Sequence, residues 1–380
     1  MALSKITHEQ GPIRPPNEAN SLLLRFTRNC PWNWCQFCPV YKKEKFSRRS
    51  LQEIKRDINS IDEAVSRLKD ISDQHGMGGA INRDLLAMVH ARYPELLAVA
   101  LWQYHRGETV FLQDADSILL PVAQLKEILE LLKEKFPEIK RITTYARSRS
   151  ILRRSIEELK LLKQAGLSRV HVGLESGNDQ VLDFMKKGVN GSQQIEAGIR
   201  IKEAGLTLSE YVILGLGGRD LWREHAVDTA RVLNEINPDY IRVRTLAIHP
   251  VSPLYESLKQ GQFKPHDGDG VIREEALLLE KLDDIDSAFY SDHILNLLEE
   301  VNGRFPGDKE RMKAVVNRYL SMPDDKRELF RLGRRTGYLR KLRDMNNSSL
   351  LTAVEKIYKQ LKNNGISVDQ YIEDLMRRYI

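Results

Sequence analysis

Short apolar runs alternate along most of this chain with segments in which apolar residues recur every three or four positions. The runs predict buried strands, and the segments between them predict helices. The predicted strands are residues 21–27, 110–112, 141–145, 169–174, 210–214 and 240–246. Six strands that alternate with helices indicate an α/β fold with a parallel sheet and right-handed crossovers, closing into a partial (β/α)6 barrel.

The predicted helices occupy the segments between these strands. Residues 50–73 have helical spacing with Ser50 as N-cap, and a second helix over residues 82–105 lies where a bare barrel has only a turn. We therefore interpret residues 75–106 as an insertion. The later helices are predicted at 122–136 and 155–165, after Asn178, after Ser192, and at 221–236.

The pattern divides the chain into four parts. Residues 1–20 are rich in proline and predict an extended arm. Residues 21–255 form the α/β core, and residues 256–275 form a linker that contains Gly, Asp and Pro. Everything in residues 276–380 reads as helical, including a terminal pair of helices from Asn346, so we expect a helical C-terminal domain.

All three cysteines of the chain lie in one loop, directly after the first predicted strand. Four residues separate Cys30 from Cys35, and two separate Cys35 from Cys38, so the thiols can converge on one soft metal centre. Iron–sulfur clusters and structural zinc sites normally take four ligands, and His8 and His75 lie outside the usual zinc spacing. Three interpretations follow: a zinc site completed by histidine, an incidental group of structural cysteines, or a cluster with one iron open to a small ligand.

The loop resembles the cluster-binding motif of the radical S-adenosylmethionine (SAM) superfamily, including the aromatic residue, Phe37, before the last cysteine. The superfamily usually has three residues between its first two cysteines, whereas this chain has four. The resemblance implies a radical SAM barrel with a [4Fe-4S] cluster held by Cys30, Cys35 and Cys38. It further implies that SAM chelates the open iron, and that one electron splits SAM into methionine and a 5′-deoxyadenosyl radical. An external reductant, flavodoxin or ferredoxin, would supply that electron.

The same resemblance assigns cofactor contacts to residues at the ends of the early strands. Asp114 and Asp116 occupy the position where the family binds the SAM amino group, although acidic residues replace the usual glycine pair. The alternative is a strand-to-helix turn that favours Asp for its own sake. Thr144 and Arg147, after the third strand, are weaker candidates for hydrogen bonds to the cofactor.

The fourth strand ends in Gly-Leu-Glu-Ser, residues 173–176, which resembles the branch of coproporphyrinogen dehydrogenase and the Elongator-type enzymes. The resemblance places Glu175 at the cofactor ribose, with Ser176 beside it, and Lys187 at the cofactor carboxylate. The alternative for Lys187 is a solvated charge at a helix end. The later strands contribute Gly215, where the backbone would approach the adenine, and then Arg244 and Leu246.

The C-terminal third offers two further features. Residues 291–296 resemble a segment that follows the core in this branch, and they predict the start of a helix. There Asp292 and His293 would exchange a proton with the substrate, or else form an N-cap and a packing histidine. Residues 326–343 carry eight basic residues and one acid, which indicates either a phosphate-bearing partner or a solvated helix face.

Composition sets the remaining limits. A net charge of +6 is modest for 380 residues and by itself does not point to a polyelectrolyte partner. The start lacks a signal-peptide run, and the longest apolar stretch, 96–102, is too short to span a bilayer, so we expect a cytosolic protein with reduced thiols. The absence of further cysteines disfavours auxiliary clusters and sulfur insertion. Methyl transfer and RNA modification remain as substrate chemistries. The rival functions are a non-catalytic iron–sulfur carrier or sensor, and a nucleic-acid-binding module with a structural three-cysteine site.

Overall fold

The computed structural model describes residues 8–376, which divide into two compact units. The first unit contains residues up to 32 together with 43–171 and 200–207, and the second contains 33–42, 172–199 and 208 onward. Part of the predicted N-terminal arm, residues 1–7, lies outside the described residues. The rest of the arm has no regular structure except one 3₁₀ turn, Pro16–Glu18.

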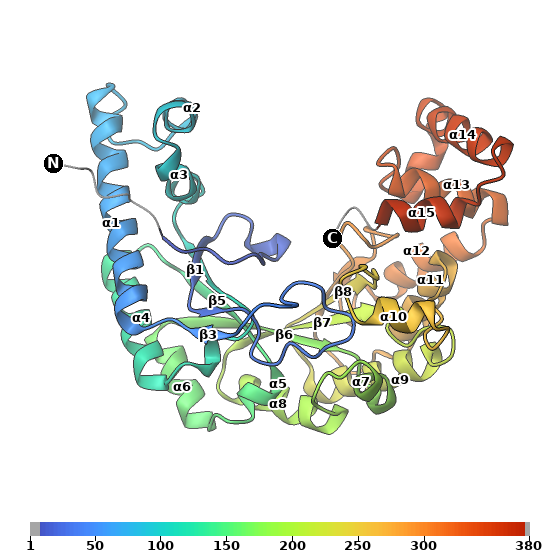
Figure 1. The fold of residues 1–380 in the computed structure, drawn as a ribbon, viewed down its shortest axis with the longest axis horizontal. Coiled ribbons are helices and arrows are strands. Elements are labelled where there is room, and N and C mark those ends of the chain that lie inside the picture. Colours follow the sequence, from blue (N-terminus) through green and yellow to red (C-terminus); the bar gives the residue numbers. More distant parts are fainter. Residues whose placement is uncertain (1–7, 377–380) are drawn as a thin grey trace. The chain divides into compact units, whose positions relative to one another are not determined.

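The first unit is built on parallel strands in the order β1, β4, β5 and β6. Their bounds are β1 Leu22–Arg25, β4 Thr109–Gln113, β5 Arg141–Ala146 and β6 Leu167–Glu175, the last of which ends in the second unit. Helices α1 (Leu51–Gln74), α4 (Val122–Lys135) and α6 (Ile156–Ala165) lie side by side along this sheet (Figure 1). Ser50 and Glu53 form a capping box at the start of α1, so the predicted N-cap is confirmed.

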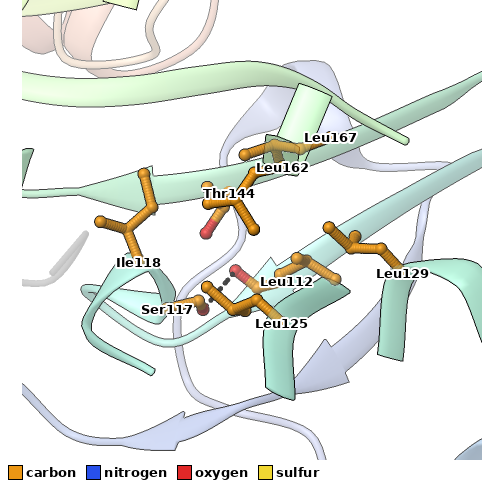
Figure 2. Close-up of a pocket in the computed structure, with 8 residues that line it drawn as sticks. All are labelled: Leu112, Ser117, Ile118, Leu125, Leu129, Thr144, Leu162 and Leu167. Atoms are coloured by element: carbon orange, nitrogen blue, oxygen red, sulfur yellow. Dashed lines mark hydrogen bonds between the residues drawn. The ribbon is translucent and has the colours of Figure 1, made fainter. Parts of the chain in front are cut away.

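Side chains alternate between the two faces of this sheet, as strand geometry requires. Leu112 and Thr144 point toward the helices, into a small apolar pocket with Leu125 and Leu162 (Figure 2). On the opposite face, the rings of Phe111, Tyr145 and His171 contact one another, with centroids 5.1 to 6.2 Å apart. Helices cover the first face, and on the second face Phe111 and His171 are fully buried, with Asn17 of the N-terminal arm 3.2 Å from the His171 ring.

The insertion contains two helices, and the prediction of one helix over 82–105 is wrong. The chain forms α2 (Arg83–Arg92), a 3₁₀ turn at Pro94–Leu96 and then α3 (Leu97–Tyr104). Pro94 ends the first helix because proline has no N–H to donate and its ring clashes with the preceding turn. The indole of Trp102 donates to the Thr109 carbonyl at 2.9 Å and fixes α3 to β4. The other short elements of this unit are β2 (Thr27–Arg28), β3 (Ser47–Arg48), η3 (Ser117–Leu119) and α5 (Ser148–Ile151).

The second unit continues from β6 with β7, β8, β9 and β10. These strands are β7 Thr207–Leu214, β8 Tyr240–Thr245, β9 Ala288–Tyr290 and β10 Asn302–Arg304. β8 is parallel to β7 and to β9, whereas β10 is antiparallel to β9. All six predicted strands are thus confirmed across the two units. Strands β9 and β10 correct the expectation that the C-terminal third is entirely helical.

Helices make up most of the second unit. They are α7 (Asp179–Phe184), α8 (Gly191–Glu203, which ends in the first unit), α9 (Trp222–Ile236), α10 (Leu254–Lys259), α11 (Gly268–Lys281), α12 (Lys309–Leu320), α13 (Asp324–Arg335), η4 (Leu342–Asn346), α14 (Ser348–Asn363) and α15 (Val368–Met376). The predicted terminal pair is confirmed as α14 and α15. Residues 291–296 form a turn after β9, so the predicted helix start there, and the N-cap alternative with it, are wrong.

Several arginines of the basic segment 326–343 form ion pairs within the second unit. Arg327 and Arg331 both bind Asp269, with N–O distances of 2.7 and 2.6 Å, and Arg334 binds Glu299 at 3.1 Å. The three arginine side chains are between 6 and 13% exposed. A solvated helix face is therefore wrong for α13, and these guanidinium groups are also closed to a phosphate-bearing partner. They join α13 to α11 and to residue 299.

Candidate functional site

The start of the cysteine loop is anchored in the first unit by Asp114. The guanidinium of Arg25 binds the buried Asp114 carboxylate at 2.6 Å, and the backbone N–H of Asn29 donates to the same oxygen at 3.0 Å. Asn29 directly precedes Cys30. Further along, the guanidinium of Arg147 lies over the Trp32 ring at 5.1 Å. Two residues predicted to contact the cofactor thus hold the protein loop.

The remainder of the loop, residues 33–42, is anchored in the second unit. The Gln36 N–H donates to the Met185 carbonyl, and the Leu254 N–H donates to the Gln36 carbonyl, each at 2.9 Å. Gln36 lies next to Cys35, so these two bonds fix the backbone between the second and third cysteines. Phe37 and Leu246 pack against a buried apolar cluster, formed by Val181, Met185, Leu216, Leu254 and Phe263.

The three thiols form a donor set suited to iron and sulfide. Cys30, Cys35 and Cys38 are half-buried, and none is in a disulfide. Thiolates are the ligands that iron–sulfur clusters take. Within residues 8–376, no three Cys, His, Asp or Glu side chains are grouped as ligands of a single metal ion.

Glu175 and Lys187, both predicted at the cofactor, form an ion pair in the second unit. Lys187 Nζ lies 3.1 Å from Glu175 Oε1, and the two side chains are 10 and 14% exposed. Glu175 has a φ of 67°, which turns its side chain at the end of β6. Lys187 follows Met185 by two residues, so the pair lies close along the chain to the residue that holds Gln36. The structure thus brings together two residues that the sequence analysis assigned to different groups of the cofactor.

A buried relay supports the ends of β6 and β7. The Gly215 N–H donates to Glu274 Oε1 at 2.9 Å, and His225 Nδ1 lies 2.9 Å from the same oxygen. His225 Nε2 reaches the Glu175 carbonyl at 3.3 Å. Through His225 of α9 and Glu274 of α11, these contacts connect the end of β6, at Glu175, with the end of β7, at Gly215. Sequence reasoning missed it because its members are about 50 residues apart and no local pattern links them.

Glu210 is a second buried acid that the sequence did not single out. Burial raises the pKa of Glu210 well above its usual range, while the Lys187 charge opposes this and the Glu175 charge adds to it. Burial therefore favours the protonated form of Glu210, whereas Glu175 forms the ion pair with Lys187. The only sequence signal was an acidic residue inside an otherwise apolar strand.

The residues predicted for proton transfer lie in the turn after β9. Asp292 is about half-exposed and lies 3.5 Å from the Arg242 guanidinium. Burial, together with the charges of Arg244 and Arg335, lowers the pKa of His293 to about 4. His293 is therefore neutral at pH 7 and a weak base. The buried Asn296 side chain fixes this turn by donating to the Val243 carbonyl at 2.8 Å.

Comparison with known proteins finds a family model that matches part of the chain. The family model of the radical SAM superfamily matches residues 88–230, from α2 to α9. This chain contains a radical SAM domain. The match begins after the cysteine loop, so it does not include the three cysteines, whose role stays a prediction from the motif.

Curated relatives of the radical SAM domain share parts of its length. The tRNA uridine(34) acetyltransferase of Methanocaldococcus jannaschii is 25% identical over 111 residues, which is 29% of this chain and 20% of that protein. The heme chaperone HemW of Bacillus subtilis is 24% identical over 157 residues, 41% of each chain. Among solved structures, the cobalamin-dependent radical enzyme OxsB aligns with a TM-score of 0.44 at 14% identity, covering 94% of this chain and 57% of that one. The chain thus spans between a fifth and two fifths of these two curated relatives.

Three residues predicted at the cofactor lie instead within the packing of the radical SAM domain. Asp116 is buried and accepts a hydrogen bond from Ser150 Oγ at 2.5 Å, and burial raises its pKa to about 7. Thr144 faces the helix-side pocket of Figure 2, because strand alternation points it away from the opposite face. The buried Ser176 hydroxyl accepts from the Asn178 N–H and closes a local turn. The described contacts of these three side chains are with the protein itself, and their cofactor contacts stay a prediction.

The backbone conformation at residue 215 explains why glycine is found there. Its φ of 84° lies in the left-handed region, which favours glycine, and its N–H is taken by Glu274.

Among residues 8–376, no helix is long and apolar enough to cross a membrane.

Proposed function

We propose that this protein is a radical SAM enzyme in which Cys30, Cys35 and Cys38 hold a [4Fe-4S] cluster with one iron open to SAM. The observation that carries the proposal is the fixed geometry of Gln36 and Phe37 between two half-buried thiols, in a chain with a radical SAM domain. When bound, the cluster would supply the electron for reductive cleavage of SAM.

The side chains of this protein would position the cofactor. Glu175 and Lys187 present one negative and one positive group at the end of β6, which suits the hydroxyl groups and the carboxylate of SAM. Phe37 and Leu246 present apolar surface beside Gly215, which suits a planar base. The contacts of Glu274 with His225 and with the Gly215 N–H would hold these groups in place.

Anaerobic reconstitution tests the proposal. The protein is expected to bind about four iron atoms per chain, and to release 5′-deoxyadenosine when SAM and a strong reductant are added. Replacement of all three cysteines by alanine should abolish both. A cluster without SAM cleavage would instead support an electron carrier or sensor, and zinc without iron would support a structural module.

We further propose tRNA as the first substrate class to test, with a cytosolic flavodoxin or ferredoxin as the physiological reductant. The tRNA proposal rests on the M. jannaschii relative, which acts on tRNA uridine. Incubating tRNA with the reduced enzyme and isotope-labelled SAM, followed by nucleoside mass spectrometry, would report a modified base. An unchanged nucleoside profile with continued 5′-deoxyadenosine release would exclude tRNA and direct the search to methyl transfer on smaller acceptors.

A further inference from the structure

A strip of arginine and tyrosine side chains covers one face of β7, β8 and β9. The strand registers pair Tyr211 with Arg242, Ile213 with Arg244, and Arg242 with Tyr290, and paired residues of neighbouring strands point to the same face. Ile241 and Val243, which alternate with the arginines, are fully buried on the other face. Arg242 and Arg244 are only half-buried, so this strip is the accessible face of the sheet.

Arg242 has a counter-ion and two aromatic neighbours on this strip. Its guanidinium lies 3.5 Å from Asp292 and 4.7 Å from the centroid of the Tyr290 ring, which stacks on Tyr240. One carboxylate and two aromatic rings therefore compensate this charge.

Arg244, one pleat further along β8, has no such compensation. Its guanidinium lies over the Tyr211 ring at 4.8 Å, and within residues 8–376 it makes no hydrogen bond or ion pair. A half-buried charge without a counter-ion is unfavourable, because burial removes hydration that nothing replaces. An arginine in this condition is a binding group for an anion that arrives from outside the protein.

The surroundings of Arg244 are also cationic and offer a second donor. The side chain of Asn296, three residues after His293, donates to the Val243 carbonyl at 2.8 Å and accepts from the Thr245 hydroxyl at 3.1 Å, so this turn packs against the two residues that flank Arg244. Arg335 is held by the Leu295 carbonyl at 2.8 Å, and the charges of Arg244 and Arg335 both lower the pKa of His293. The Leu295 N–H donates to His293 Nδ1 at 3.3 Å, so the neutral ring carries its proton on Nε2. Asp292, the one carboxylate in this turn, is engaged by Arg242.

The strip lies next to the cofactor side of the second unit. Leu246, two residues beyond Arg244, packs in the same cluster as Phe37 of the cysteine loop. A molecule bound at Arg244 would therefore lie close to any group held by residues 35–38.

We propose that Arg244, with His293 beside it, binds a carboxylate or phosphate group of the substrate. The guanidinium offers two parallel N–H donors that match the two oxygens of such a group, and Nε2–H of His293 offers a further donor. The site is argued from side chains of the second unit alone, whereas its assignment to the substrate rests on the proposed function.

The test measures His293 by NMR in the reconstituted full-length protein without SAM. Histidine is labelled with ¹⁵N, and a His293→Gln variant identifies the resonance. Inorganic phosphate and malonate are the two probes, with chloride at equal ionic strength as the reference. Either anion, when bound, is expected to raise the pKa of His293, because it neutralises the adjacent Arg244 charge. The anion with the larger effect identifies phosphate or carboxylate as the preferred group.

Variants make the result specific to Arg244. Arg244→Gln should weaken binding of the preferred anion by roughly tenfold to a hundredfold, the loss expected for a hydrogen bond to a charged group. Arg231→Gln, an exposed arginine of α9 paired with Glu235, is the matched control and should bind as the wild type does. Should Arg244→Gln fail to fold, Arg244→Lys keeps the charge but loses the two-pronged geometry, and should still weaken binding.

Two results would overturn the proposal: a His293 titration that neither anion moves, or an equal response in Arg244→Gln. Because the measurement uses no SAM, it is independent of SAM cleavage. Failure to form 5′-deoxyadenosine would overturn the proposed function and leave the anion site standing.

Discussion

Gly173 lies directly beneath the side chain of Glu175, and a Cβ atom at residue 173 would be 2.2 Å from Glu175 Oε1. The same Cβ would lie 3.1 Å from Lys187 Nζ. Glycine at position 173 of strand β6 therefore leaves the space that the Glu175–Lys187 ion pair occupies above the backbone.

Gly173→Ala is expected to displace the Glu175–Lys187 pair and to weaken SAM binding at least tenfold, since one charge-assisted contact is worth about 1.5–3 kcal/mol. Isothermal titration of SAM into the reconstituted protein measures this. Gly307→Ala is the matched control, because an added Cβ there comes no closer than 3.9 Å to its neighbours and should leave affinity unchanged. Equal affinities of the two variants would remove the pair from the binding site.

Phe37→Ala is expected to loosen the cysteine loop. The ring packs on the apolar cluster, and a buried Phe→Ala costs about 3–5 kcal/mol, so a half-buried ring should cost less than that range. We expect a lower iron content after reconstitution and faster loss of iron to a chelator. Trp34→Ala, in the same loop but 66% exposed, should retain its iron. Iron loss of the same size in both variants would contradict a specific role for Phe37.

Asp116→Asn should change the pH dependence of stability. The pKa of Asp116 is raised to about 7 in the folded protein, against 3.8 as its ordinary value. The folded state therefore binds more protons than the unfolded state between these values, so this group lowers stability as pH rises from about 4 to 7. The asparagine variant escapes that loss while still accepting from Ser150. Its stability relative to wild type, from urea unfolding, should rise between about pH 4 and 7 and level off above that. A difference that stays flat with pH would show that Asp116 titrates normally.

Glu274→Ala should destabilise the second unit, because it leaves the Gly215 N–H and the His225 ring without their acceptor. Each unsatisfied buried donor costs roughly 1–3 kcal/mol. Chemical denaturation measures the loss, and Glu274→Gln, which keeps one acceptor oxygen, should lose less. Glu280→Ala on the same helix, at an exposed position, should stay within about 0.5 kcal/mol of wild type. A similar stability for Ala and Gln at 274 would mean that the relay contributes nothing.

The sequence was sufficient for the strands and for the cysteine motif. Apolar runs predicted strands β1 and β4 to β8, and Ser50 predicted the N-cap of α1. Both signals involve residues that are close in the chain, so they can be read without knowing the fold. The sequence also singled out Glu175 and Lys187, but as separate cofactor contacts and not as an ion pair.

Tertiary structure alone decided the partners of charged side chains. The sequence did not indicate that three of the eight basic residues of 326–343 bind Asp269 and Glu299. It also did not indicate that Arg25 forms an ion pair with Asp114. The turn at 291–296 likewise depends on Asn296 reaching the Val243 carbonyl, 53 residues away. Local periodicity fixes where a strand or helix forms, but the free energy of a buried charge depends on groups brought near it only by folding.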